Sequence, residues 1–367
     1  MAKLGEVCLL KAGKFVSAND ISPEYNKGLY PCFGGNGIRG YVADYTHDGE
    51  FPLIGRQGAL CGNVNLASGK FHATEHAVVV QPKIEMNVHW LYYALNAMNL
   101  GQYATGAAQP GLAVSKLETL SIEIPNISEQ NKIAQTLYKV EQLVNFRKQQ
   151  LAKLDELVKA RFVEMFGDAK LNPNNLPCCS LSEYIVFLTS GSRGWSQYFT
   201  DSGEYFITIK NVKNCKITLQ DVQCVTPPDN AEAKRTRVQE NDLLISITAD
   251  LGRTGIVPKE IAEHGAYINQ HLTCIRLKQD KLNPLYVAYY MESDAGKEQF
   301  VAKNQSAVKA GLNFNAINSL KLMVPPLALQ NQFAAFVERV DQQKQTVQQS
   351  LEKLELMKKA LMQEYFG

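Results

Sequence analysis

The chain carries an internal repeat, and this repeat constrains its fold more than any other feature. Residues 107–167 align without a gap on residues 307–367, at an offset of 200 residues. Of these 61 aligned positions 19 are identical, whereas average composition would give about four by chance. A duplicated unit predicts two similar halves related by pseudo-twofold symmetry.

Each copy of the repeat ends in a segment that is predicted to be one long helix. Apolar residues alternate there at spacings of four and three, the heptad seam of a helix that packs along another helix. The seam residues of the first copy are Ile133, Leu137, Val140, Leu151 and Leu154, and those of the second are Phe333, Val337, Val340, Leu351 and Leu354. About 39 residues at 1.5 Å each predict a rod of roughly 58 Å.

Cationic residues interrupt both seams. Arg147 and Arg161 interrupt the first, Lys344 and Lys358 interrupt the second, and each aligns with an apolar residue of the other copy. Because a polar seam residue fixes partner and register, we expect the two helices to pack on each other, antiparallel, within one chain. Alternatively, these long side chains extend into solvent from ordinary core helices.

The remaining segments share an order of features. Each passes from short strand-like stretches through an Arg-bearing turn to a strand led by His76 or His271, and then to a helix rich in Tyr and Leu. This order predicts an α+β fold in which two globular domains are joined by two long antiparallel coiled-coil helices, with a pseudo-twofold internal repeat. The predicted domains are residues 1–125, 126–167, 168–324 and 325–367, of which the second and fourth are the helices.

A glycine-rich stretch, Gly35-Asn36-Gly37-Ile38-Arg39-Gly40, matches the G-x-G-x-x-G pattern of dinucleotide-binding loops. Such a loop requires a helix directly behind it, whose N-terminal amides hold the pyrophosphate. The residues that follow, from Tyr41 to Gly49, instead indicate strand and turn. The glycines are therefore interpreted as residues that permit positive φ in tight β-turns.

No other motif indicates catalysis by this chain. Pro228-Asp229 with Glu232 and Lys234 imitates a metal-dependent nuclease pattern, but the spacing is too short to place two carboxylates on neighbouring strands. An amino-methyltransferase motif, a Walker loop and a Gly-x-Ser-x-Gly turn are all missing. His76 and His271 recur between the copies, which favours a structural role.

The composition favours a cytoplasmic protein without a metal site. Eight cysteines include no C-x-x-C pair, so reduced thiols are expected rather than a zinc site or a disulfide framework. No apolar run approaches the roughly 18 residues that a membrane span needs. The net charge is +2 and no segment is polybasic, so any nucleic-acid surface must come from local arrangement or from partners.

Several stretches together resemble one known family. They are the helix endings "VKARFVEMFGD" and "KKALMQEYFG", the turn series "YPCFGGNGIRGYV…FPLIGRQGALCGNVNLASGKFHATEHAVVV", and "FLTSGSRGW…YFITIKNV". Over nearly its whole length the chain resembles the specificity (S) subunit of type I restriction-modification systems. The resemblance implies a non-catalytic subunit with two target-recognition domains, each reading one half of a bipartite site in double-stranded DNA.

The resemblance also implies partners. The helices would set the spacer between the half-sites and dock two adenine methyltransferase (M) subunits, and restriction/translocase (R) subunits would join them. S-adenosylmethionine is expected in the methyltransferase subunit, and no cofactor is expected in this chain.

The predicted DNA contacts follow from the chemistry of base edges. Arg suits guanine, Asn or Gln suits adenine, and Lys and backbone amides hold phosphates. In the first domain the predicted contacts are Asn36, Arg39, Arg56, Gln57 and Lys70, and in the second they are Ser192, Arg193, Trp195, Lys210, Asn211, Arg253 and Gln270. Each of these side chains could instead be solvated or could stabilise a turn.

Two other classes of protein stay open at this point. A coiled-coil adaptor with two protein-binding lobes and no DNA role would share the repeat, but would show no salt-dependent DNA binding. A stand-alone nuclease would cleave DNA by itself with a divalent metal.

Overall fold

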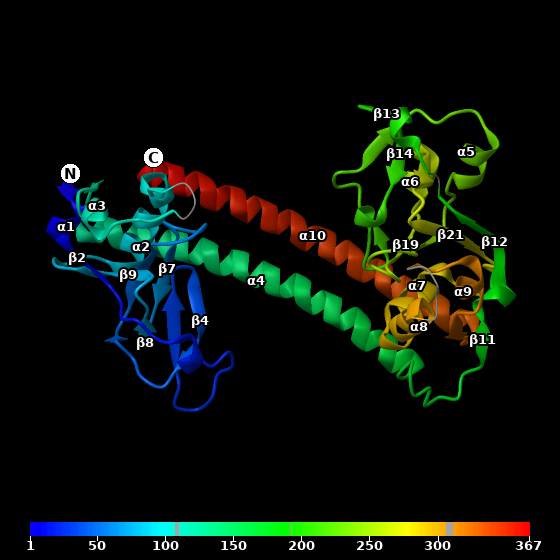
Figure 1. The fold of residues 1–367 in the computed structure, drawn as a ribbon, viewed down its shortest axis with the longest axis horizontal. Helices are drawn as coiled ribbons and strands as arrows, with labels where there is room; N and C mark the ends of the chain where they lie inside the picture. Colours follow the sequence, from blue (N-terminus) through cyan, green and yellow to red (C-terminus); the bar gives the residue numbers. More distant parts are fainter. Residues whose placement is uncertain (107–109, 192, 306–310) are drawn as a thin grey trace. The chain divides into compact units, whose positions relative to one another are not determined.

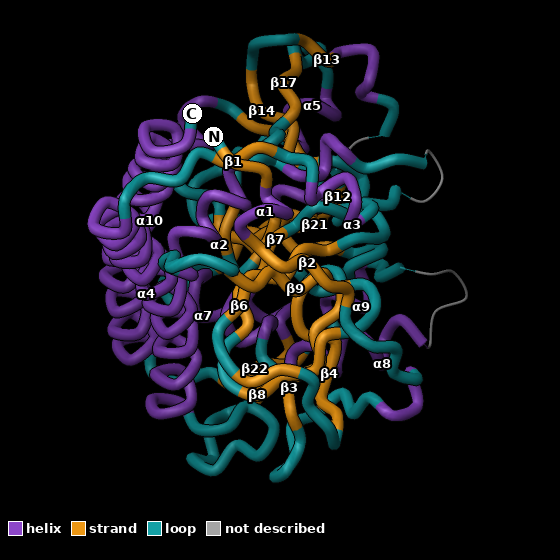
Figure 2. The backbone as a smooth tube through the Cα atoms, turned by 90° about the vertical axis from the view of Figure 1, so that its left-hand side faces the viewer, coloured by secondary structure: helices purple, strands orange, loops and turns teal. Residues whose placement is uncertain are grey.

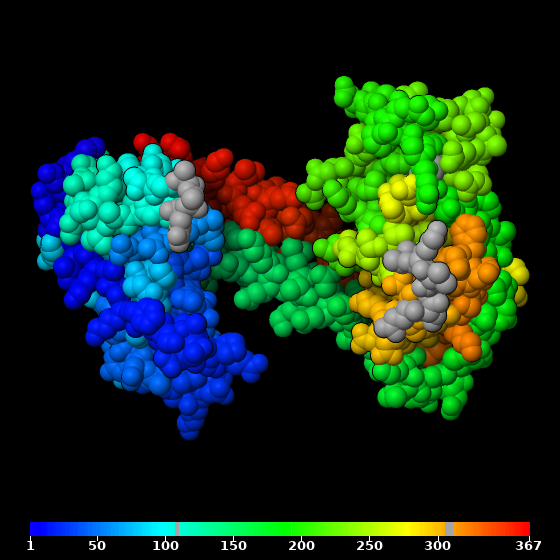
Figure 3. Space-filling model, in the orientation of Figure 1, coloured from blue at the N-terminus to red at the C-terminus, as the bar shows by residue number. Residues whose placement is uncertain are grey.

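The structure, a computed structural model, describes residues 1–106, 110–191, 193–305 and 311–367 (Figure 1). The chain divides into two compact units, Met1–Gln150 with Val347–Gly367, and Leu151–Thr346. Each unit contains one globular lobe together with part of both long helices (Figure 3). The predicted α+β fold with two long helices is confirmed.

The first lobe, residues 1–125, contains two four-stranded sheets. One is antiparallel, in the order β2-β9-β6-β7, and the other has the order β4-β3-β8-β5 with β3 and β8 parallel. Val78 and Val80 of β9 pack in one core with helix α2, whereas Val79 packs in another core with Phe71. The alternation of a strand thus makes β9 the wall between two cores. The elements are β2 (Cys8–Ala12), β3 (Tyr30–Gly34), β4 (Gly37–Val42), β5 (His47–Asp48), β6 (Phe51–Gly55), β7 (Val64–Ala67), β8 (Lys70–Ala73), β9 (Ala77–Pro82) and α2 (Val88–Ala97).

The second lobe, residues 168–324, repeats this plan. Its sheets have the orders β12-β21-β18-β19 and β13-β17-β14-β20, and again one pair in the second sheet, β14 with β20, is parallel. Its elements are β12 (Ile185–Ser190), β13 (Phe199–Thr200), β14 (Glu204–Ile207), β17 (Gln223–Val225), β18 (Leu243–Ser246), β19 (Thr254–Ile256), β20 (Ala266–Ile268), β21 (Leu272–Leu277), α7 (Pro284–Glu292) and α8 (Asp294–Gln305).

Short elements complete the chain, and Figure 2 shows them as purple helices and orange strands between teal loops. The two-stranded pairs are β1 (Ala2–Lys3) with β10 (Ser121–Ile122), β11 (Cys178–Ser180) with β22 (Lys321–Met323), and β15 (Val212–Lys213) with β16 (Lys216–Ile217). The short α-helices are α1 (Leu4–Val7), α3 (Val114–Glu118), α5 (Ala231–Thr236), α6 (Lys259–His264) and α9 (Phe314–Asn318), and the 3₁₀ helices are η1 (Ala18–Asp20), η2 (Leu100–Tyr103), η3 (Leu181–Tyr184), η4 (Trp195–Tyr198) and η5 (Ile209–Asn211).

The predicted long helices are α4 (Ile127–Phe166) and α10 (Leu327–Phe366), each of 40 residues. In the first unit, Leu137 near the start of α4 packs in one core with Leu361 near the end of α10. In the second unit, the rings of Phe166 at the end of α4 and Phe333 near the start of α10 have their centres 5.6 Å apart. The helices are therefore antiparallel in both units, as predicted.

The predicted seam is the inner face of the two helices. Ile133, Leu137, Val140, Phe333, Val337, Val340 and Leu351 are buried, and Leu151, Leu154 and Leu354 are half-buried. The residues between them are largely exposed, so each helix buries one apolar stripe and presents polar residues on its other faces.

Three of the four cations in the seam bond to the opposite helix. The Nζ of Lys358 lies 2.7 Å from Oε1 of Glu141, and Lys344 pairs with Asp155. The Nε of Arg147 donates to Oγ of Ser350 at 3.2 Å. These three side chains therefore do not simply extend into solvent, because each bonds to a residue of the opposite helix. Arg161 forms its ion pair within its own helix, with Glu164 at 2.8 Å, and its guanidinium lies 5.7 Å from the centre of the Phe336 ring of α10.

An identical pair of residues anchors each lobe to its helix. In the first unit, Oε1 of Gln130 accepts from the N–H of Asn87 at 2.9 Å, and Oδ1 of Asn131 accepts from Nδ2 of Asn87 at 2.7 Å. Gln330 and Asn331 make the same two bonds to Asn283, at 2.9 and 3.0 Å. Asn87 and Asn283 in turn cap α2 and α7. These hydrogen bonds explain why Gln and Asn occur at the same positions in both copies of the repeat.

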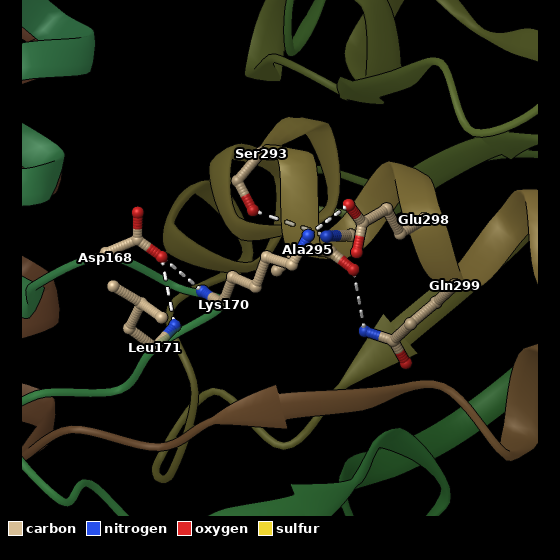
Figure 4. A network of polar contacts seen from close by, with 8 residues as sticks. Asp168, Lys170, Leu171, Ser293, Ala295, Glu298 and Gln299 are labelled. Atoms are coloured by element: carbon tan, nitrogen blue, oxygen red, sulfur yellow. Dashed lines mark hydrogen bonds and ion pairs between the residues drawn. The ribbon is translucent and has the colours of Figure 1, made fainter.

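A polar network holds the segment that leaves α4 (Figure 4). Gly167 ends the helix with φ +81°, the left-handed conformation that favours glycine at a helix C-terminus. Oδ1 of Asp168 accepts from the N–H groups of Lys170 and Leu171 at 2.8 and 3.0 Å. The Nζ of Lys170 then pairs with Oε1 of Glu298 on α8 at 2.7 Å. The turn thereby joins α4 to the second lobe.

Candidate nucleic-acid interface

Three loops of the first lobe meet where its two sheets end. They are the Gly34–Gly37 turn between β3 and β4, the loop between β6 and β7, and the loop between β8 and β9. The N–H of Thr74 donates to O of Phe33 at 2.9 Å, and the N–H of Arg56 donates to O of His76 at 3.0 Å. These bonds fix the three loops to one another and place their side chains on one surface.

A shallow depression of about 470 Å³ lies between these loops. Its lining residues are Gly35, Asn36, Gly37, Ile38, Arg39, Gln57, Gly58, Ala59, Leu60 and His76. The glycine-rich stretch therefore forms a β-turn, as predicted, with Gly37 at φ +92°. It forms one rim of a mixed polar and apolar surface.

The depression brings together three of the five predicted DNA contacts of this lobe. Asn36, Arg39 and Gln57 are exposed on its lining, and Oδ1 of Asn36 accepts from Nδ2 of Asn63 at 2.8 Å. Arg56 is half-buried and does not line the depression, and its Nε has no hydrogen-bond partner among the described residues. Lys70 is not part of this group, because it begins β8 at the end remote from Thr74, with its ammonium 4.7 Å from the centre of the Tyr45 ring.

His76, for which its recurrence predicts a structural role, lines the depression. Its Nε2 lies 3.2 Å from Oε1 of Glu75, and its buried Nδ1 has no partner among the described residues. Its recurrence between the two copies was the available signal. His76 and His271 occupy equivalent positions in the two lobes, and in the first lobe this position lines the depression.

The second lobe has the same frame of loops. The N–H of Asn269 donates to O of Ile207 and the N–H of Ile247 donates to O of His271, both at 3.0 Å, as Thr74 and Arg56 do in the first lobe. A further pair of equivalent bonds completes the frames. The N–H of Leu112 donates to O of Arg56, and the N–H of Leu312 donates to O of Ile247, both at 2.9 Å. The backbone is thus repeated while the side chains at the surface differ.

The predicted contacts of the second lobe are distributed over this frame and its edge. Arg193 and Lys210 are exposed. Arg253 is paired with Asp250, and Nε2 of Gln270 lies 3.1 Å from Nε2 of His271. Ser192 lies outside the described residues.

Two predicted contacts are corrected by the structure, because their side chains are buried. Trp195 is 3% exposed and stacks on Phe206, with the ring centres 5.5 Å apart. Asn211 is 1% exposed, and its side chain accepts from the N–H of Thr208 at 3.0 Å and donates to O of Thr218 at 3.1 Å. Both residues stabilise the loops from inside and are not available to DNA.

Tyr267, on β20 of the second lobe, has a raised pKa and supports the scaffold through its hydroxyl. Burial, together with the neighbouring Glu204 carboxylate, raises the pKa of Tyr267 to about 12. Its hydroxyl donates to Oε2 of Glu204 at 2.9 Å, and Glu204 also pairs with Arg237 at 2.9 Å. This tyrosine is therefore a neutral hydrogen-bond donor at neutral pH, and not an acid or base.

A family model described as "Type I restriction modification DNA specificity domain" matches residues 1–156 and 193–356. The chain belongs to this family. Each of the two matched segments contains the frame of loops of one lobe and a large part of one long helix. The repeat is therefore a duplication of the specificity domain.

One curated relative has a high identity over part of its length. The type I restriction enzyme EcoprrI specificity subunit of Escherichia coli is 53% identical over 143 residues, which is 39% of this chain and 36% of that protein. The match thus spans about a third of that relative's length.

Solved structures with low sequence identity share the fold of this chain. The crystal structure of the S subunit from M. genitalium has a TM-score of 0.67 at 17% identity and covers 100% of this chain and 95% of that one. A chain from a structure titled for complex assembly and conformational transition of the type I R-M system has a TM-score of 0.57 at 16% identity, and covers 100% and 96%.

No helix among the described residues is both long and apolar enough to cross a membrane. In the same part of the chain, no group of three or more His, Cys, Asp or Glu side chains could hold a metal ion.

Proposed function

We propose that this specificity protein is the non-catalytic DNA-recognition subunit of a type I restriction-modification complex, and that each lobe reads one half of a bipartite site. The observation that carries the proposal is the repeated loop frame, which has the same backbone bonds in both lobes but different side chains on its surface. A common frame allows both lobes to approach DNA in the same way, and different side chains allow each lobe to select a different sequence.

The chemistry of the first lobe suits the edges of bases. Amide side chains such as Asn36 and Gln57 pair with adenine, and Arg39 provides the fork that pairs with guanine. Ile38 and Leu60 are 55% and 49% exposed on the same lining, and apolar groups of this kind contact the thymine methyl. The mixture is typical of a surface that discriminates bases, since a surface that only held phosphates would be mainly cationic.

The long helices are proposed to set the spacer and to dock two adenine methyltransferase subunits. In the first unit, Leu143, Phe146 and Met357 are 47%, 58% and 52% exposed, and in the second Leu157 and Val163 are 46% and 54% exposed. Such apolar residues on a helix surface favour burial against a partner protein. Restriction/translocase subunits would join the methyltransferases, which would supply S-adenosylmethionine and the chemistry, in the cytoplasm.

The proposal is tested by expressing the chain with its host's adenine methyltransferase subunit in a bacterium that lacks adenine methylation. Sequencing of the DNA for N6-methyladenine is expected to give one split motif. A complex that co-purifies intact and yet leaves the DNA unmethylated would contradict the proposal. It would favour the alternative of a coiled-coil adaptor with two protein-binding lobes.

A further inference from the structure

The loop between β18 and β19 carries an ion pair in the interface frame of the second lobe. Nη2 of Arg253 lies 2.6 Å from Oδ2 of Asp250, and the two side chains are 36% and 63% exposed. The same loop is bonded to the Asn269–His271 loop through the N–H of Ile247. The pair therefore belongs to the surface that the proposed function assigns to DNA.

One buried side chain, that of Ser246, holds the backbone of both Asp250 and Arg253. The hydroxyl of Ser246, which is fully buried, donates to the carbonyl of Asp250 and accepts from the N–H of Arg253, the latter at 2.9 Å. The N–H of Gly252 donates to O of Ser246 at 3.0 Å, with Gly252 at φ +79°. A Cβ at Gly252 would lie 2.3 Å from the Phe300 ring, so this conformation requires glycine. The geometry is thus present before any ligand binds.

The first lobe shows what this position faces. The N–H of Gly62 donates to O of Gly55 at 2.7 Å, the same bond that Gly252 makes to Ser246. The next residues, Asn63 and Arg253, are therefore equivalent. Because Asn63 bonds to Asn36 on the lining of the depression, we infer that Arg253 is at the edge of the corresponding surface of the second lobe.

The hydrogen-bonding groups of the pair match one base pair. The major-groove edge of G·C presents two acceptors on guanine, N7 and O6, followed by the N4 amine donor of cytosine. A guanidinium beside a carboxylate presents two donors followed by an acceptor, in the complementary order. An A·T pair presents acceptor, donor, acceptor, so its thymine O4 would be left without a donor.

Resting on the proposed function, we propose that Asp250 and Arg253 together read one G·C pair in the second half-site. Arg253 donates to guanine O6 and N7, while Asp250 accepts from cytosine N4 and holds the guanidinium in place. A pair of this kind is unsuited to holding phosphate, because the exposed carboxylate would face the charge of the backbone.

The test uses the whole complex with the methyltransferase and compares methylated motifs by sequencing. Asp250→Ala and Arg253→Ala are each expected to lower the preference for G·C about 10- to 100-fold at one and the same position, in one half-site only, since a good bidentate contact discriminates by ~1–3 kcal/mol. Asp250→Asn, which keeps the volume of the side chain, covers the case in which Asp250→Ala disturbs assembly. It keeps one acceptor oxygen but loses the charge that holds the guanidinium of Arg253, so it is expected to relax the same position by less than Asp250→Ala does.

The control is Asp229→Ala, which breaks an exposed pair with Lys234 at 2.9 Å in the same lobe and is expected to leave the motif unchanged. The inference is overturned if the wild-type motif persists in the Asp250 and Arg253 variants, or if the two variants alter different positions. Failure of the proposed function is distinguishable, because the wild-type complex itself would then produce no split motif.

Discussion

At the scale of single residues, some residues are identical in the two copies of the repeat because they make buried hydrogen bonds. Gln330 is fully buried, its Oε1 accepts from the N–H of Asn283, and its Nε2 donates to O of Pro325 at 2.7 Å. Gln330→Ala would leave these two buried backbone groups unpaired, so we expect a loss of about 1–3 kcal/mol in the free energy of unfolding. Thermal unfolding measures the loss as a lower Tm. The exposed neighbour Gln332→Ala should leave Tm unchanged, and equal effects of the two substitutions would argue against the anchor.

The equivalent histidines of the two lobes differ in what they contact. Nδ1 of His271 lies 2.7 Å from Oγ1 of Thr248 and its Nε2 is bonded to Gln270, whereas Nδ1 of His76 has no partner among the described residues. His271→Ala is therefore expected to lower Tm by more than His76→Ala does. His76→Ala should instead relax base preference in the first half-site by about 10-fold, the range for one base contact. A large fall in Tm for His76→Ala with an unchanged motif would restore its structural interpretation.

At the scale of elements, the cations in the seam decide how α4 and α10 are aligned. Lys358 and Glu141 are 34% and 25% exposed, so a like-charge pair there could not be relieved fully by water. Lys358→Glu is expected to cost about 1–2 kcal/mol, read as a lower Tm. Lys148 and Glu355 form the matched control, since they pair across the same two helices at 2.9 Å with 57% and 48% exposure. Lys148→Glu should cost less than about 1 kcal/mol, and the reverse order of the two effects would refute a role of Lys358 in alignment.

The long helices and the glycine turns could be predicted from sequence because their causes are local. A heptad seam is visible in spacing alone, and Gly37 and Gly167 occupy positive φ where a turn and a helix end require it. Trp195 and Asn211 could not be placed, because their burial depends on Phe206 and Thr218, which only the folded lobe brings near them. Asp250 was missed because a carboxylate suggests repulsion from DNA until its bond to Arg253 is seen.

At the scale of the whole molecule, the length of the helices is proposed to set the number of base pairs between the two half-sites. The pairs Glu141–Lys358 and Asp155–Lys344 place the residues near 150 of α4 opposite those near 349 of α10. Removing one heptad from each helix, residues 147–153 and 346–352, keeps these outer pairs in register and shortens each helix by about 10 Å. The methylated motif should then lose about three base pairs of spacer, at roughly 3.4 Å per base pair. An unchanged spacer in an assembled complex would refute the role of the helices as a ruler.

The central claim is that each lobe reads its own half of the DNA site. It is tested most directly by sequencing the N6-methyladenine motif of three complexes, which carry wild-type chain, Arg39→Ala in the first lobe, or Arg253→Ala in the second. We predict a split motif in which Arg39→Ala relaxes bases of one half alone and Arg253→Ala relaxes bases of the other half alone. If either substitution relaxes both halves, or weakens methylation equally at every sequence, the lobes are not independent readers and the claim is wrong.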